Sequence, residues 1–185
     1  MNDELMAAAL EAQYRAALQM LGKAMTKTPA GEWNGPEQQT PVWQLAYHTL
    51  WATKFYLTAS PETFAPWADA IPGAESLGGT EEWENPEPGL QPEGFHTKPE
   101  LQRYLEDILN QLSEQVRGLP FSEHSGFEWY PFSRLELHLN NLRHIQHHTA
   151  QIIERLKQKG IFGFPWPIAG HNRGGGRATS RYERK

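Results

Sequence analysis

The sequence of 185 residues contains no cysteine. Disulfide frameworks, thiolate metal sites and cysteine nucleophiles are therefore excluded. Long apolar runs are also missing, because polar residues interrupt each apolar stretch after a few positions, and the N-terminus lacks the basic-then-apolar order of a signal peptide. We therefore expect no association with a membrane and a cytoplasmic location.

An excess of positive charge is missing as well. The formal net charge is −5, whereas a general nucleic-acid surface needs clustered Lys and Arg to displace counterions from phosphates. What the chain does have is 11% aromatic residues, including seven Trp, beside 21% charged residues. That balance is typical of a folded globular protein, and the length suits one domain with one core. We expect no nucleic-acid partner.

Four segments show helical periodicity. The first is indicated by the spacing of its apolar residues, and the start of the second by a proline. Residues 2–27 repeat apolar side chains at spacings of three and four, which predicts one buried helix face. The second helix is expected to begin at Thr40, with Pro41 in the first helical position, and to run to about Thr58.

The third and fourth helices are marked by capping boxes. Thr97 is followed three residues later by Glu100, and Ser133 by Glu136. In such a pair each side chain accepts a hydrogen bond from the backbone of the other, which fixes the start of a helix. The fourth helix is expected to continue until Gly160 ends it.

The connection between the second and third helices is long. Residues 59–96 are rich in Pro, Gly and acidic side chains and contain no recognisable strand. A connection of that length allows the second and third helices to run parallel. The sequence therefore predicts an all-α, four-helix bundle over residues 1–160, with a long crossover between helices 2 and 3.

The chain changes in character after the fourth helix. Residues 162–167 are rich in aromatic residues and proline, and we expect them to dock on the bundle. The C-terminal segment 161–185 ends in a Gly-rich and basic tail, residues 171–185. It is read either as a solvated end or as a contact for an anionic partner, and the lack of apolar anchors favours a solvated end.

Histidines form the candidate site. His144 and His148 are four residues apart, so they project from one side of a helix about one turn apart and can share one ion. His48 on the second helix is the best third ligand. On a helical wheel the pair lies at the border of the apolar sector, whereas His138 falls in its middle and His147 on the polar side. We therefore leave His138 and His147 out of the site.

Spacing by itself leaves alternatives open. A pair four residues apart also occurs on helices that bind no metal, and eight histidines make coincidence easier. The zinc-protease motif requires Glu directly after the first histidine, but Ile145 stands there, which disfavours a metalloprotease.

Two segments, 41–48 (PVWQLAYH) and 144–151 (HIQHHTAQ), together resemble the DinB-like, or DinB/YfiT, superfamily of metal-binding four-helix bundles. That family has one histidine in its second helix, then a histidine pair four apart, and Gln three residues after the second. The matching positions in this chain are His48, His144, His148 and Gln151. Thr149 and Ala150 stand where relatives often have Arg-Gly, a departure that bears on the substrate and not on metal binding.

The resemblance implies a crossover bundle, often dimeric, in which three histidines hold nickel, zinc or iron. Some relatives are S-transferases or isomerases that use a low-molecular-weight thiol, and many are described only as metal-dependent hydrolases. It therefore implies a metal-dependent enzyme for a small-molecule substrate, with a thiol cosubstrate or water. The alternative is a non-catalytic, metal-stabilised dimeric bundle, since fold and family do not fix activity.

Three further residues are expected near the ion. Gln151 is read as a hydrogen-bond partner of a ligand or of bound water, or alternatively as a polar surface residue. Trp51 and Phe55 follow His48 by about one and two turns. They are read as lining an apolar substrate pocket or, alternatively, as core packing. No carboxylate stands out as a general base, and the other tryptophans are assigned no binding role.

Overall fold

The computed structural model describes residues 3–35, 40–77, 92–118 and 120–170. Within these ranges the regular structure is helical, which confirms the predicted all-α fold. The elements are α1 (Asp3–Lys27), the short α2 (Ala30–Trp33), α3 (Val42–Tyr56), the 3-10 turn η1 (Pro61–Thr63), α4 (Lys98–Arg117) and α5 (Arg134–Gln158). The short elements α2 and η1 were not predicted, because four- and three-residue turns show no helical periodicity.

The two predicted capping boxes begin α4 and α5. The Thr97 amide donates to Glu100 Oε2 at 2.7 Å, and the Ser133 amide donates to Glu136 Oε2 at 3.1 Å. In both cases the hydroxyl accepts from the glutamate's own amide. After α5, Gly160 has a φ of 78°, a left-handed conformation that glycine adopts without steric cost. The chain therefore leaves the helix where the sequence predicts.

The start of α3 differs from the prediction. The helix begins at Val42, so placing Pro41 inside it, after a cap at Thr40, is wrong by one residue. Pro41 is extended, and its carbonyl is the first to accept from the helix, taking the Leu45 amide at 3.2 Å. The Thr40 carbonyl is instead held by Arg155 Nη1 at 2.7 Å. A tertiary contact from α5 therefore sets where α3 begins.

The end of α3 is also fixed by α5. The helix ends at Tyr56, slightly before the expected Thr58. Arg134, the first residue of α5, is buried and donates to the carbonyl of Thr58 at 2.8 Å and to that of Ala59 at 2.6 Å. Because the guanidinium donates to these two carbonyls, they need no hydrogen bond from a further helical turn, and the helix can end here. The start of α5 is thereby joined to the end of α3, so the two helices are antiparallel.

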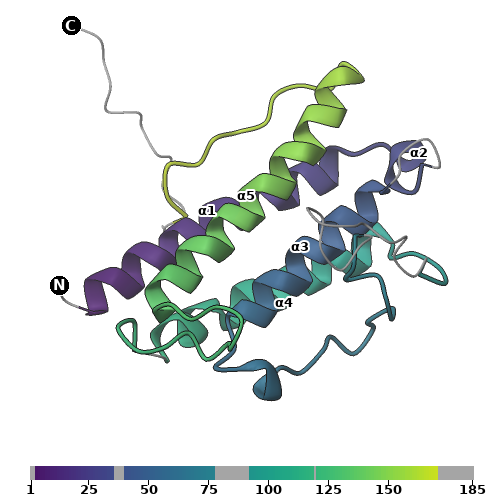
Figure 1. Cartoon of the computed structure of the whole chain (residues 1–185). Helices are drawn as coiled ribbons and strands as arrows, with labels where there is room; N and C mark the ends of the chain where they lie inside the picture. Colours follow the sequence, from purple (N-terminus) through teal and green to yellow (C-terminus); the bar gives the residue numbers. More distant parts are fainter. Residues whose placement is uncertain (1–2, 36–39, 78–91, 119, 171–185) are drawn as a thin grey trace, which may run out of the picture.

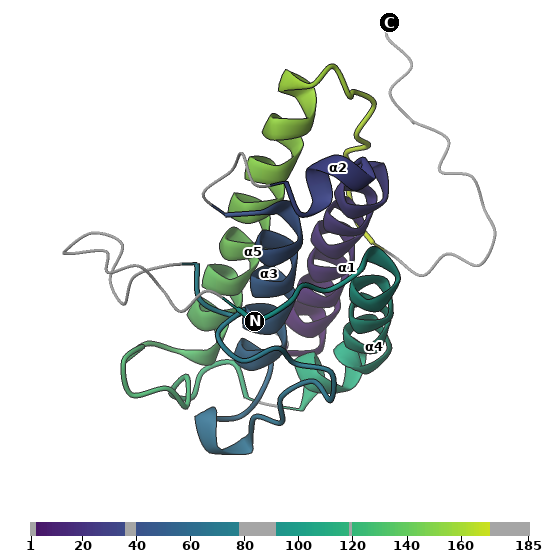
Figure 2. The same ribbon diagram turned by 90° about the vertical axis from the view of Figure 1, so that its right-hand side faces the viewer.

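The four long helices form a bundle in which α1 and α3 each pack on α4 and α5 (Figures 1 and 2). Glu11, early in α1, lies 3.4 Å from Arg117 at the end of α4. Thus α4 opposes α1 in direction, as α3 opposes α5. Tyr14 of α1 meets His138 of α5, and Met20 meets Gln146 further along, so α1 and α5 run in the same direction. It follows that α3 and α4 are parallel, as a crossover between them predicts. Residues 78–91 of that crossover lie outside the described residues, and the domain bounds 1–160 stay a prediction.

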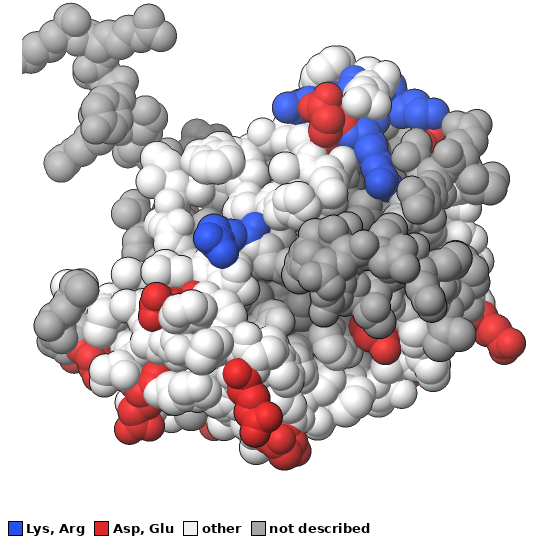
Figure 3. Space-filling model, viewed as in Figure 1, with Lys and Arg blue, Asp and Glu red and all other residues white. Residues whose placement is uncertain are grey.

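Charged side chains occupy the outer faces of the helices. In Figure 3, Lys and Arg gather over the C-terminal end of α5, whereas most Asp and Glu lie along the opposite edge of this face. Wide areas between the two edges are uncharged. Among the described residues, no helix combines the length and the apolar character needed to cross a membrane.

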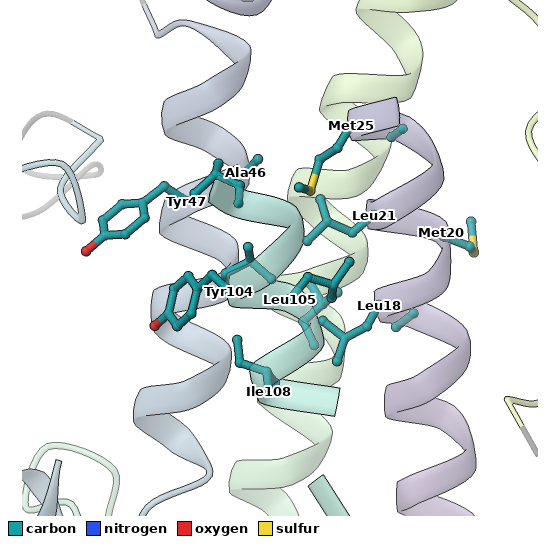
Figure 4. Close-up of a cluster of buried hydrophobic side chains, with 14 of the residues drawn as sticks. Leu18, Met20, Leu21, Met25, Ala46, Tyr47, Tyr104, Leu105 and Ile108 are labelled. Carbon is teal, nitrogen blue, oxygen red and sulfur yellow. The ribbon is translucent and has the colours of Figure 1, made fainter. Parts of the chain in front are cut away.

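The inner faces meet in one apolar cluster (Figure 4). Gly22 allows α1 and α4 to approach closely, because an added Cβ would lie 2.7 Å from Leu105 Cδ2. Thr49 of α3 and Ile145 of α5 are fully buried, whereas the residue before each of them is half-buried. The residues just before them, His48 and His144, therefore lie at the border of the core.

Residues 161–170 lie against α1 as a strap through backbone contacts at its two ends, whereas the side chains of Phe162 and Trp166 are mainly exposed. The Gly170 amide donates to the Ala12 carbonyl at 2.8 Å, and Lys27 Nζ donates to the Phe162 carbonyl at 2.6 Å. A cavity of about 500 Å³ lies between the strap and the outer side of α5 and is lined in part by Trp166. The basic tail, residues 171–185, is outside the described residues.

Candidate metal centre

Three histidines from two helices converge at the border of the core. His48 Nε2, on α3, lies 2.9 Å from His144 Nε2, and His148 Nε2 lies 3.1 Å from the same atom. One ring nitrogen of each histidine lies within 4.8 Å of the other two. His148 is buried, and the other two are half-buried. The structure thus brings together the three residues selected from the sequence.

The outer ring nitrogens of two of them face oxygen acceptors. His48 Nδ1 is 2.6 Å from the carbonyl oxygen of Glu75, and His148 Nδ1 is 2.8 Å from Gln151 Oε1. A carbonyl oxygen only accepts, so Nδ1 carries the proton in each ring. In the neutral imidazole the lone pair is then on Nε2, the nitrogen that points toward the other histidines.

The centre of this arrangement has too few N–H donors for its short contacts. His144 Nε2 faces the Nε2 lone pairs of both His48 and His148. A neutral His144 offers at most one N–H there, which cannot satisfy two short contacts in different directions. Its own Nδ1 is buried, with no hydrogen-bond partner among the described residues. A cation at the shared point would satisfy all three lone pairs, so the donor set fits a metal ion.

Burial favours the neutral form of His48 and His144. Desolvation lowers the pKa of His48, and the hydrogen bond to the Glu75 carbonyl offsets part of that effect. Desolvation lowers the pKa of His144 to about 3, with further contributions from the neighbouring His48, His148 and His147. Neutral imidazole is the form that binds a metal ion, so no proton must be displaced from His48 or His144 at neutral pH.

The two histidines left out of the site lie elsewhere. His138 is fully buried, and its Nδ1 lies 3.1 Å from the Tyr14 hydroxyl. His147 is exposed. Its ring lies 4.9 Å from that of His148, centroid to centroid, but it contributes no nitrogen to the convergent group.

Trp51 and Phe55 belong to a larger group, here called the aromatic cluster: Trp51, Phe55, Phe64, Phe127 and Trp129. Trp51 and Phe55 stack at 4.9 Å between ring centroids, and the ring of Phe55 lies 5.1 Å from that of Phe127. The last three members come from loops, Phe64 from the segment after α3 and Phe127 and Trp129 from the segment before α5. Helical periodicity concerns one segment at a time, so it could not indicate these loop residues, and Trp129 was assigned no role.

The contact between the Glu75 carbonyl and His48 was also not predicted from the sequence. It is made by a backbone carbonyl, which every residue has, so no residue type could have indicated it. The neighbouring Ser76 carbonyl accepts from Gln44 Nε2 of α3 at 2.7 Å. This second contact holds the segment against α3 and keeps the Glu75 carbonyl aimed at His48.

Comparison with known proteins identifies a family. A sequence profile described as the DinB superfamily matches residues 13–152, a span that includes the three convergent histidines and Gln151. No curated protein and no solved structure matches the chain significantly.

Proposed function

The chain belongs to the DinB superfamily, and from this premise we propose that His48, His144 and His148 bind a divalent metal ion that acts on a small-molecule substrate. The observation that carries the proposal is the convergence of three Nε2 atoms, with contacts of 2.9 and 3.1 Å. Nitrogens bound to one ion at ~2.1 Å lie roughly 3–3.5 Å apart, so these two contacts would need to open by only a few tenths of an ångström. We propose nickel, zinc or iron as the ion.

The surrounding residues support this assignment by orienting the ligands. The Glu75 carbonyl holds His48 with its Nε2 lone pair inward, and Gln151 does the same for His148. Partners of this kind fix the tautomer and raise the basicity of a ligating imidazole. Desolvation lowers the pKa of His48 and of His144, which favours the neutral imidazole that binds a metal ion.

A divalent ion held there would supply a Lewis acid that lowers the pKa of a thiol or of water. We propose either thiol transfer, with a low-molecular-weight thiol as cosubstrate, or hydrolysis. The absence of cysteine means that the sulfur of a transfer reaction must come from such a cosubstrate. Three protein ligands are typical of catalytic metal sites, whereas a fourth is typical of structural ones, and the described residues supply three.

The proposal is tested with purified, metal-loaded protein. Elemental analysis should find about one divalent ion per chain. The protein is then incubated with an electrophilic acceptor and each of several low-molecular-weight thiols, with and without chelator. Acceptor consumed only when both metal and thiol are present identifies a transferase, and ester or amide cleavage that needs metal alone identifies a hydrolase. Protein that retains no divalent ion after loading and gel filtration would refute the proposal.

We propose that the protein is a homodimer. Phe162, Trp166 and Ile168 of the strap are 64%, 75% and 85% exposed. Apolar side chains that gather on one exposed segment are typical of a surface that another chain covers. A monomeric profile in sedimentation velocity would refute this proposal without affecting the metal site.

A further inference from the structure

The aromatic cluster begins one helical turn from the histidines. Trp51 and Phe55 follow His48 by three and seven residues, so all three project from one side of α3. With a rise of 1.5 Å per residue, the two rings begin ~5 and ~10 Å along the helix axis from His48. The ring of Phe64, from the segment after α3, lies 5.4 Å from Trp51 and 5.0 Å from Phe55.

The cluster has a buried base and an exposed surface. Phe127 is fully buried, whereas Trp51, Phe55 and Phe64 are half-buried. Trp129 is 59% exposed, yet its ring is parallel to that of Phe55 within 6°, with centroids 6.1 Å apart. A folded protein gains little stability from an aromatic ring left mainly in water. The exposed rings therefore call for a reason other than core packing.

The loop that carries Trp129 is held firmly. The Ser125 amide donates to the Phe132 carbonyl at 2.9 Å, which closes the loop at its base. Gly126 has a φ of 87°, and an added Cβ would overlap the Ala59 carbonyl oxygen, so this loop packs directly on the segment after α3. An exposed ring on a rigid loop is preorganised, and a ligand that stacks on it loses little free energy to ordering.

The base of the cluster is tied to the helices that carry the histidines. The Arg134 guanidinium lies 5.8 Å from the centre of the Phe127 ring and also holds the carbonyls after α3. Phe127 in turn contacts Phe55 and, at 5.4 Å, Trp129. The cluster and the three histidines therefore keep a fixed spacing, because both are fastened to α3 and α5.

We infer that the aromatic cluster binds a flat aromatic group of the substrate while the reacting group lies at the three histidines. This inference rests on the proposed metal function and adds a substrate class to it. Parallel and edge-on rings offer stacking faces to a planar ligand, and stacking on fixed aromatic rings favours aryl groups beyond their apolar area. The substrate would carry its aryl group ~5–10 Å from the reacting atom, the span of one to two helical turns.

The experiment uses hydroxamates, which chelate divalent metal ions, as probes. Zinc-loaded protein is titrated with acetohydroxamate, with hydroxamates that carry a phenyl group on linkers of zero to four methylenes, and with cyclohexyl counterparts. We expect acetohydroxamate to bind weakly, and a phenyl group on the best linker to strengthen binding by about tenfold or more. The cyclohexyl compounds should gain clearly less.

Variants then locate the gain. In Trp129→Ala and in the size-conserving Phe55→Leu, the phenyl advantage should fall to within about twofold of acetohydroxamate, while metal content and acetohydroxamate affinity stay unchanged. Trp166→Ala is the matched control, because Trp166 is also an exposed tryptophan but lies on the strap. It should leave the phenyl advantage intact, and circular dichroism should show each variant folded.

The outcomes separate the two proposals. If acetohydroxamate binds but no phenyl compound binds better, or if cyclohexyl and phenyl compounds gain equally, the aromatic subsite is refuted and the metal site stands. A phenyl gain that survives both cluster substitutions refutes it as well. If zinc-loaded protein does not bind acetohydroxamate, the metal function fails and the subsite that rests on it fails too.

Discussion

The helix α5 carries two histidines that invite comparison, the fully buried His138 and, six residues later, the half-buried His144. Desolvation lowers the pKa of His138 to about 4 and that of His144 to about 3. By that measure the two are alike. Their surroundings differ, because His138 meets the hydroxyl of Tyr14 and the charge of Arg134, whereas His144 meets two other imidazoles. A lowered pKa thus reports burial, and only the convergence of nitrogens indicates a metal site.

The two histidines should also differ in what their substitution affects, which is folding in one case and metal binding in the other. His138 is enclosed in the core and joins α5 to α1 through Tyr14, so changing it should affect folding. His144 lies at the border of the core and joins α5 to α3 through His48, so changing it should affect binding. The following predictions test that division, beginning with the largest effect.

Loss of a convergent histidine should remove the metal. We expect His48→Ala, His144→Ala and His148→Ala each to weaken metal affinity by more than the roughly 100-fold that loss of a supporting partner can cost, because each removes a direct ligand. Elemental analysis after gel filtration, with calorimetric titration, measures this. His147→Ala is the matched control, since His147 touches the His148 ring without joining the group. Equal metal loss in the control would contradict the assignment.

Lowering the pH should show that His138 contributes to the stability of the fold. Its pKa is lowered from 6.5 to about 4 in the folded protein, so between those values the unfolded chain binds more protons. The contribution of neutral His138 to the free energy of unfolding is therefore complete above pH 6.5. It is lost as the pH falls toward 4, and the total loss is about 3 kcal/mol. We expect the gap in unfolding free energy between metal-free wild type and His138→Asn to narrow over that range in urea titrations. A gap that does not change with pH would contradict this interpretation.

A smaller effect is expected at Gln151. Its Oε1 faces His148 Nδ1 at 2.8 Å, and without it that ring loses its preferred orientation and tautomer. We expect Gln151→Ala to weaken metal affinity by about 10- to 100-fold. Gln158→Ala is the control, because it is an exposed glutamine at the end of the same helix. If the two variants bind metal equally well, Gln151 is only a surface residue.

The smallest effect concerns the start of α5. Ser133→Ala removes the oxygen that accepts from the Glu136 amide, and we expect a loss of about 1 kcal/mol in unfolding free energy. Thr97→Ala should cost a similar amount at the start of α4. Urea denaturation measures both, and metal affinity should stay unchanged in each. A drop in metal affinity in Ser133→Ala alone would show that the frame of α5 and the metal site are not independent.

Much of the fold could be predicted because its signals are local. Both capping boxes lie within four residues, and apolar periodicity within single helices separated His138 from the His144 and His148 pair. The start of α3 was misplaced because the Thr40 carbonyl is claimed by Arg155, 115 residues away. No local pattern contains that contact.

The candidate site likewise contains residues that the sequence could predict and residues that it could not. Spacing and family resemblance were enough to select His48, His144, His148 and Gln151. The Glu75 carbonyl, Phe64, Phe127 and Trp129 became visible only in the structure, because they reach α3 from loops. A carbonyl has no residue type to read, and a lone aromatic residue in a loop has no partner within its own segment.

The sequence by itself determined four helices, two of their starts and which histidines share a helix side, because these depend on hydrogen bonds and periodicities spanning a few residues. Only the tertiary structure decided that three Nε2 lone pairs meet, which tautomer faces inward and which rings lie beside them. Those features depend on how α3 packs against α5. Packing sums many weak, distant contacts that no single segment encodes.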